Sequence, residues 1–131
     1  MNVEGNTLQQ YARNRGGELP GAGLEYPFGP DWEVHKVRGK VFMLITEITG
    51  EPIVIVKAEP EDGKALRERH KDITPGYHMN KQHWITLHPG GDLPKQLVVD
   101  LVTQSYLLVV EKLPHSRRPV DPNTFGRGQR S

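Results

Sequence analysis

The hydrophobic positions of this 131-residue chain recur at helical spacing in some segments and in short continuous runs in others. In residues 92–114, apolar side chains return every three or four positions, which predicts one long amphipathic helix. Leu8 and Tyr11 lie three residues apart and predict a short helix over residues 6–14. In residues 59–72 a proline and acids precede a basic end, the order that the helix dipole favours, so a further helix is expected there.

Strand signals occupy the middle of the chain. Three runs rich in β-branched residues are separated by turn residues and predict an antiparallel meander: residues 33–38, 40–47 and 52–57. A hairpin is expected within residues 75–91, which read PGYHMNKQHWITLHPGG. The resulting order is α-β-β-β-α-β-β-α. It predicts an α+β, two-layer sandwich, in which helices cover one face of an antiparallel sheet.

Two of the predicted strands are apolar on both faces. Residues 41–45 and 53–56 are hydrophobic at nearly every position, whereas a sheet with one wet face alternates apolar and polar residues. A second layer must therefore cover part of the other face. The two alternatives are the glycine- and proline-rich segment 15–31, which excludes a long helix or a central strand, and a second copy of the chain.

Composition indicates an ordinary globular domain, with 35% hydrophobic and 25% charged residues. No segment has the roughly 20 consecutive apolar residues of a membrane helix, and no signal-peptide pattern is visible, so we expect no membrane association. Cysteine is absent, which removes disulfides and thiolate metal sites and favours the cytoplasm. One domain over residues 1–114 is expected, followed by a basic, disordered tail over residues 115–131 that lacks hydrophobic periodicity.

Positive charge is concentrated in a few places, although the whole chain carries only +1. Residues 114–131 carry four arginines and one aspartate, which leaves the rest of the chain at −2. Within that slightly acidic body, residues 35–40 and 64–71 each sum to +3. A nucleic-acid-binding function would therefore depend on a local patch rather than on a strongly basic surface.

The predicted hairpin carries most of the candidate chemistry. A four-residue loop at 79–82 would place Tyr77 opposite Trp84 and His78 opposite His83. These two histidines, alone or with His35, can chelate a metal, but no carboxylate or third histidine stands at a recognisable ligand spacing. The histidines are therefore expected to be structural, and no metal or other cofactor is expected.

Three segments together resemble the MmcQ/YjbR family: EYPFGPDWEVHKVRGKVFML, GYHMNKQHWITL and VVDLVTQSYLLVVEKLP. They occur in the family's order and cover nearly all of residues 24–114. The resemblance implies a compact α+β fold similar to CyaY-like and secretion-chaperone-like two-layer folds. Members of this family are generally described as DNA-binding, so the resemblance also implies a DNA partner.

Two functions remain open at this point. The first is weak, largely sequence-nonspecific binding of the DNA backbone without catalysis, in which cations contact phosphates and aromatic rings offer stacking surfaces. The residues expected to form that site are Lys36, Arg38, Lys40, Arg67, Arg69, Tyr77, His78, Asn80, Lys81, His83 and Trp84. The alternative is a protein-interaction module, a homodimer or a chaperone-like protein, that uses the second sheet face.

Catalytic activity is not expected. Serines are few and lie either mid-helix, at Ser105, or in the tail, at Ser116 and Ser131. No glycine loop has phosphate-binding spacing and no carboxylate pair suits acid–base work.

Overall fold

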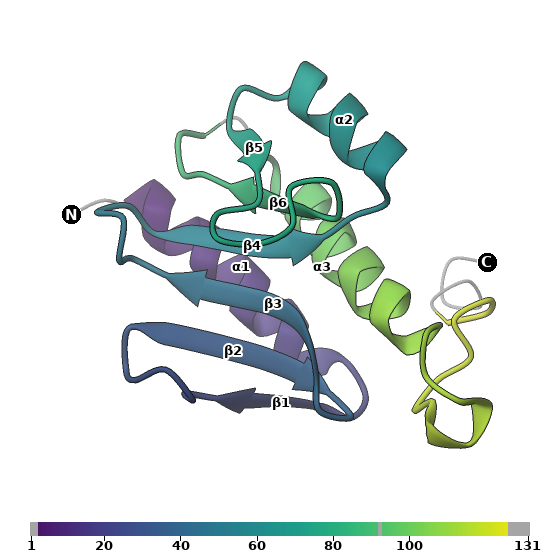
Figure 1. The fold of residues 1–131 in the computed structure, drawn as a ribbon. Coiled ribbons are helices and arrows are strands. Elements are labelled where there is room, and N and C mark those ends of the chain that lie inside the picture. Colours follow the sequence, from purple (N-terminus) through teal and green to yellow (C-terminus); the bar gives the residue numbers. More distant parts are fainter. Residues whose placement is uncertain (1–2, 92, 126–131) are drawn as a thin grey trace.

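The computed structural model describes residues 3–91 and 93–125, which form an antiparallel six-stranded sheet in the order β1-β2-β3-β4-β6-β5. The strands are β1 (Ala22–Glu25), β2 (Trp32–Val37), β3 (Lys40–Thr46), β4 (Ile53–Lys57), β5 (Ile73–Pro75) and β6 (Trp84–Leu87). The helices are α1 (Val3–Glu18), α2 (Pro60–Arg69) and α3 (Lys95–Val110), followed by the 3-10 helix η1 (His115–Arg117). Helices α1 and α3 lie side by side behind the sheet, and α2 lies beyond its β5 edge (Figure 1).

The α+β class and the predicted order of elements are confirmed, with one added strand, β1. This strand comes from the glycine- and proline-rich segment and lies at the edge of the sheet, where irregular backbone is tolerated. None of the helices described in residues 3–91 and 93–125 combines the length and the apolar character that a bilayer crossing requires.

Helix α1 runs further than the pattern predicted, through Gly16 and Gly17. Glycine usually costs about 1 kcal/mol in a helix relative to alanine. At Gly16 the packing explains its presence, because an added Cβ would lie 2.8 Å from Cε of Met43 and 3.3 Å from Nδ1 of His35. A side chain at this position would therefore require Met43 and His35 to shift.

The layer between the sheet and the helices is anchored by polar contacts as well as apolar ones. The ring of Tyr106 is fully buried, meets Phe42 edge to face, and donates its hydroxyl to the carbonyl oxygen of Pro20. Ser105 donates to the carbonyl oxygen of Phe42 and accepts the backbone N–H of Lys57. These bonds hold α3 at a fixed place on β3 and β4, because buried polar groups are stable only when paired.

The second sheet face is covered by neither of the two expected candidates. It carries the buried side chains Val34, Leu44, Ile53, Ile55 and Trp84. Tyr77 and Met79, from the loop over residues 76–83, pack on this cluster. The loop passes in front of the strands, opposite α1 and α3 (Figure 1). The hairpin segment itself therefore supplies the missing layer, and the second face is not an open surface for a partner.

The expected pairing within this hairpin is wrong. Strand β5 ends at Pro75, and its register pairs Thr74 with Thr86, one residue away from the predicted alignment. Tyr77 consequently leaves the sheet and stacks on Trp32 instead of facing Trp84, with ring centroids 6.3 Å apart and planes 11° apart. Gly76 permits this exit, because a Cβ there would lie 2.6 Å from Cβ of Trp84.

Residues 115–125 also differ from the expected disordered tail. Helix η1 follows Pro114, and Val120 and Phe125 pack against the main core. The Phe125 ring lies 6.1 Å from that of Tyr106. Arg118 donates from Nε to the carbonyl oxygen of Leu113 and from Nη2 to that of Glu111. The apolar residues of this segment follow no periodic pattern, so the sequence could not predict that they pack on the core. The expected disorder of residues 126–131 lies outside the described residues.

We predict that Trp84→Ala lowers the free energy of unfolding by about 3 kcal/mol, because a large buried ring is lost from the second face. Trp84 is only 9% exposed and is part of the cluster that the loop covers. Phe28→Ala is the matched control, since Phe28 is 72% exposed and its loss should change stability by less than about 0.5 kcal/mol. Urea unfolding measures both, and equal midpoints for the two variants would contradict the assignment.

Truncation after Pro114 should lower the free energy of unfolding by on the order of 2 kcal/mol, because Val120 and Phe125 leave the core. Phe125→Ala should reproduce part of this loss, whereas Ser116→Ala, at an exposed position, should not. Thermal unfolding followed by circular dichroism measures the three variants. A truncated chain that melts like the full chain would show that these contacts contribute nothing.

Candidate nucleic-acid interface

The residues predicted to bind nucleic acid fall in three separate places. Lys36, Arg38 and Lys40 flank the β2–β3 turn, and Arg67 and Arg69 lie on α2 beside the opposite edge of the sheet. The remaining residues belong to the hairpin loop and the start of β6: Tyr77, His78, Asn80, Lys81, His83 and Trp84. The structure therefore does not join them into one continuous patch.

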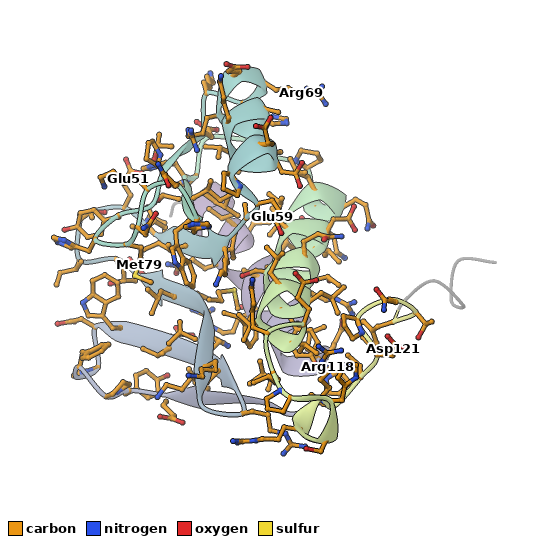
Figure 2. All side chains as sticks on the ribbon, turned by 45° about the vertical axis from the view of Figure 1, so that its right-hand side comes forward. Glu51, Glu59, Arg69, Met79, Arg118 and Asp121 are labelled. Atoms are coloured by element: carbon orange, nitrogen blue, oxygen red, sulfur yellow. The ribbon has the colours of Figure 1, made fainter. Side chains whose placement is uncertain are left out.

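The hairpin loop is held by its own hydrogen bonds. The backbone N–H of Tyr77 donates to Oγ1 of Thr86 over 2.9 Å, and Nζ of Lys81 donates to the carbonyl oxygen of Gly76 over 2.9 Å. Oδ1 of Asn80 accepts the backbone N–H of Gln82 over 2.8 Å. The loop thus has a defined shape over the second face, where Met79 is labelled in Figure 2.

Tyr77 of the loop and Trp84 of β6 both contact other side chains of the same chain. Tyr77 stacks on Trp32, and Trp84 is buried with Nζ of Lys57 5.9 Å from its ring centroid. Trp84 is too buried for a base to stack on it, and Tyr77 already stacks on Trp32. The prediction that they form a stacking platform therefore has no geometric support.

The two loop histidines, His78 and His83, do not belong to a group of metal-ligating side chains in the described residues. His78 is exposed, adopts a φ of 58°, and rests its ring 4.1 Å from that of Tyr77. A positive φ is uncommon for a residue other than glycine and marks a tightly constrained turn. His83 is also exposed, and no group of three histidine or carboxylate side chains in the described part of the chain is placed to hold a metal ion.

A basic corner forms where the β2–β3 turn meets the segment after α3. Arg38 and Gly39 have φ values of 51° and 81°, which is the type I′ geometry of tight hairpins. Nε of Arg38 donates to the carbonyl oxygen of Arg117 over 2.9 Å. This bond brings together two basic segments that are far apart in sequence. We define the basic corner as Arg38, Lys40, Arg117 and Arg118.

The other predicted cations do not contribute to the corner in the same way. Nζ of Lys36 lies 3.1 Å from Oε1 of Glu25, so its charge is neutralised within the sheet edge. Arg69 lies at the far tip of α2, away from Arg118 and Asp121 on the segment after α3 (Figure 2). The basic corner and α2 thus lie at opposite ends of the molecule.

A partly buried cluster of titratable groups was not predicted. Arg13 of α1 donates from Nε to Oε1 of Glu33 on β2 over 3.0 Å and from Nη2 to Oε2 over 2.7 Å. Burial alone would raise the pKa of Glu33, but the hydrogen bonds and charge of Arg13 outweigh it and hold the pKa below its usual 4.5. The pair lines a cleft of about 360 Å³ with Gln9, Asp31 and Glu47. Residues so far apart in sequence give no signal of such a pairing.

His35 lies next to this pair. Its side chain is 5% exposed, and its Nε2 lies 3.5 Å from Oε1 of Glu33, too far for a well-formed hydrogen bond. Burial lowers the pKa of His35 below its usual 6.5, although Glu33 acts in the opposite direction. The imidazole is therefore held neutral in the folded protein at neutral pH.

Comparison with known proteins gives consistent matches. The family model described as YjbR matches residues 17–108. The chain is 39% identical to the uncharacterized protein YbdF of Escherichia coli O157:H7 over 111 residues, which cover 85% of this chain and 91% of that protein. It is 36% identical to the uncharacterized protein YjbR of E. coli K12, covering 73% of this chain and 83% of the other.

Solved structures agree on the fold. A crystal structure of the Deinococcus radiodurans protein DR2400 superposes with a TM-score of 0.75 at 34% identity, covering 81% of each chain. A crystal structure of a Pseudomonas syringae protein superposes with a TM-score of 0.64 at 27% identity, covering 76% of this chain and 96% of that one. The names of these relatives specify no ligand or reaction.

We predict that the free energy of unfolding falls as the pH is lowered below 6.5, the usual pKa of histidine. The unfolded chain binds a proton at His35 in that range while the folded chain resists it, so stability present above 6.5 is lost below it. The contribution of one histidine to the slope cannot exceed about 1.4 kcal/mol per pH unit. Urea unfolding at several pH values should show a flatter dependence for His35→Gln, and an unchanged slope would contradict the burial of this imidazole.

Proposed function

The chain belongs to the YjbR family, and we propose that it binds the DNA backbone through the basic corner, weakly and with little sequence preference. The observation that carries this proposal is the bond between Arg38 and the carbonyl oxygen of Arg117. It combines two basic segments into one surface. The corner itself needs no catalytic group, because phosphate contacts position a nucleic acid without reacting with it.

The composition of the corner suits phosphates. Arg38, Lys40 and Arg117 are exposed, so their charges can reach a partner without moving the backbone. The acids nearest to Arg117 in sequence are Asp121 and Glu111, and the acid nearest to Arg38 is Glu33, which is paired with Arg13. Cations therefore outnumber carboxylates at this corner, although the whole chain is almost neutral. A small local excess of charge supports weak binding that depends on salt.

Low sequence preference follows from the same geometry. Base edges are read by side chains that enter a groove, and aromatic rings bind single strands by stacking. The corner consists of a tight turn and a short 3-10 helix rather than a long helix or ribbon that could fill a groove. Tyr77 and Trp84, which were expected to stack on bases, are engaged with Trp32 and Lys57.

The protein-interaction alternative loses its expected surface, because the chain's own loop covers the second sheet face. The large hydrophobic side chains that are exposed in the described residues are elsewhere: Leu24, Tyr26, Phe28 and Ile48. They lie on β1, the β1–β2 loop and the β3–β4 turn, mainly at the ends of the strands opposite the basic corner. Nothing in their arrangement identifies a partner, so DNA binding is the proposal we retain.

We predict that Lys40→Ala combined with Arg117→Ala weakens binding of duplex DNA and reduces the slope of log K against log salt by about 1.8, or about 0.9 for each lost phosphate contact. Both side chains are exposed, and the Arg117 carbonyl that receives Arg38 is kept. Fluorescence anisotropy of a labelled duplex over a salt series, starting at low ionic strength, measures both quantities.

The matched control is Lys64→Ala with Arg69→Ala, which removes the same charge from exposed positions on α2. This control should retain the wild-type slope. If both double variants lose affinity equally, binding depends on total charge rather than on the corner. If neither changes it, the corner is not the site.

A further inference from the structure

A hydrogen-bonded chain of three side chains crosses the end of the sheet opposite the basic corner. Oγ1 of Thr74 lies 2.8 Å from Nε2 of His88, and Nδ1 of His88 lies 2.8 Å from Oε1 of Glu51. Thr74 is on the edge strand β5, His88 follows β6, and Glu51 is in the β3–β4 turn. Hydroxyl, imidazole and carboxylate are thus linked in the order that activates an oxygen nucleophile.

The carboxylate decides which nitrogen carries the proton. An ionised carboxylate can only accept hydrogen bonds, so Nδ1 of His88 must be the donor to Glu51. A neutral imidazole then has its lone pair on Nε2, which accepts the hydroxyl hydrogen of Thr74. This is the tautomer that a general base needs, with its basic nitrogen directed at the hydroxyl.

The neighbouring threonine shows a different arrangement. Thr86 is paired directly with Thr74 in the ladder, yet its hydroxyl donates to the carbonyl oxygen of Pro75 and accepts the N–H of Tyr77. Its hydrogen-bonding capacity is used to fix the loop. The hydroxyl of Thr74 is instead bonded to the imidazole.

All three members of the chain line one cavity of about 220 Å³. Lys81 lines the same cavity. Its ammonium group has three N–H bonds, and one of them is used by the carbonyl oxygen of Gly76. A cation with spare donors can stabilise the negative oxygen that develops when a carbonyl is attacked. A cavity of this volume has room for a small ester.

We propose that Thr74, His88 and Glu51 form a hydrolytic site for small acyl esters, separate from the DNA-binding corner. Oγ1 of Thr74 attacks the ester carbonyl while its proton passes to Nε2 of His88. The bond to the leaving alcohol then breaks, and that oxygen takes the proton from Nε2. Water attacks the acyl-threonine, passes a proton through Nε2 to Oγ1, and releases the acid, so that ester and water become acid and alcohol.

The sequence did not indicate this site, because the expected nucleophiles were serines. Thr74 stands in a short strand whose pairing was misaligned by one residue, and its partners come from a turn and from the end of β6. Only the fold brings the three side chains together.

The test measures hydrolysis of 4-nitrophenyl acetate by the full chain. Wild type should turn over the ester, Thr74→Ser should retain turnover because the hydroxyl is kept, and Thr74→Val and His88→Gln should each lower kcat/KM by on the order of 100-fold. His115→Gln removes an exposed imidazole outside the cavity and should leave the rate unchanged. Circular dichroism melting curves establish that every variant is folded.

Mass spectrometry after acid quenching distinguishes acylation of Thr74 from background reaction of surface groups. An acetyl adduct on Thr74 that disappears in Thr74→Val supports the proposal. Hydrolysis that Thr74→Val retains, an adduct on another residue, or no turnover by wild type overturns it. DNA binding by Thr74→Val is expected to stay at the wild-type level, so the two sites can fail independently.

Discussion

A sheet that is apolar on both faces must be covered on both sides, and most of this structure depends on how that is achieved. Strands β3 and β4 carry buried side chains towards α1 and α3 and also away from them. Leaving either set in water would cost roughly 25 cal/mol for each Å² of apolar surface. The helices cover one face and the loop over residues 76–83 covers the other, with Tyr77 stacked on Trp32.

The covering loop also determines where function can be located. The faces of the sheet are largely closed, and both proposed sites lie at the ends of the strands. At one end, Arg38 of the β2–β3 turn donates to the segment after α3, and this contact brings the basic side chains of the two segments together. At the other end, the β3–β4 turn brings Glu51 to His88 beside the cavity that the loop partly encloses. The basic corner and the chain of Thr74, His88 and Glu51 are therefore separated by the length of the strands.

Buried and partly buried polar groups define the packing between the layers. Arg13 and Glu33 fix α1 against β2, and Ser105 fixes α3 against β3 and β4. Each such group would be costly if it lost its partner, so these contacts favour one arrangement of helices on the sheet. His35 is the exception, because it is buried beside Glu33 without a good bond at Nε2, and burial lowers its pKa.

Sequence patterns predicted the α+β class and the order of its main elements, because hydrophobic periodicity and turn residues are local signals that each segment carries alone. The sequence also showed that the second face of β3 and β4 needed a cover, since both strands are apolar throughout. It also indicated that the basic residues at 36–40 form a local patch. The sequence named His78, His83 and Lys81 as candidate residues, but it did not show which groups they contact.

The fold was needed to show which segment covers the second face, which register β5 adopts, and that residues 115–125 pack on the core. It alone joined Arg38 to Arg117, and Thr74 to His88 and Glu51. These contacts connect residues distant in sequence, and each depends on which surfaces remain uncovered after the others have packed. A one-residue shift in register redirects every side chain of a strand, so local patterns cannot specify such contacts.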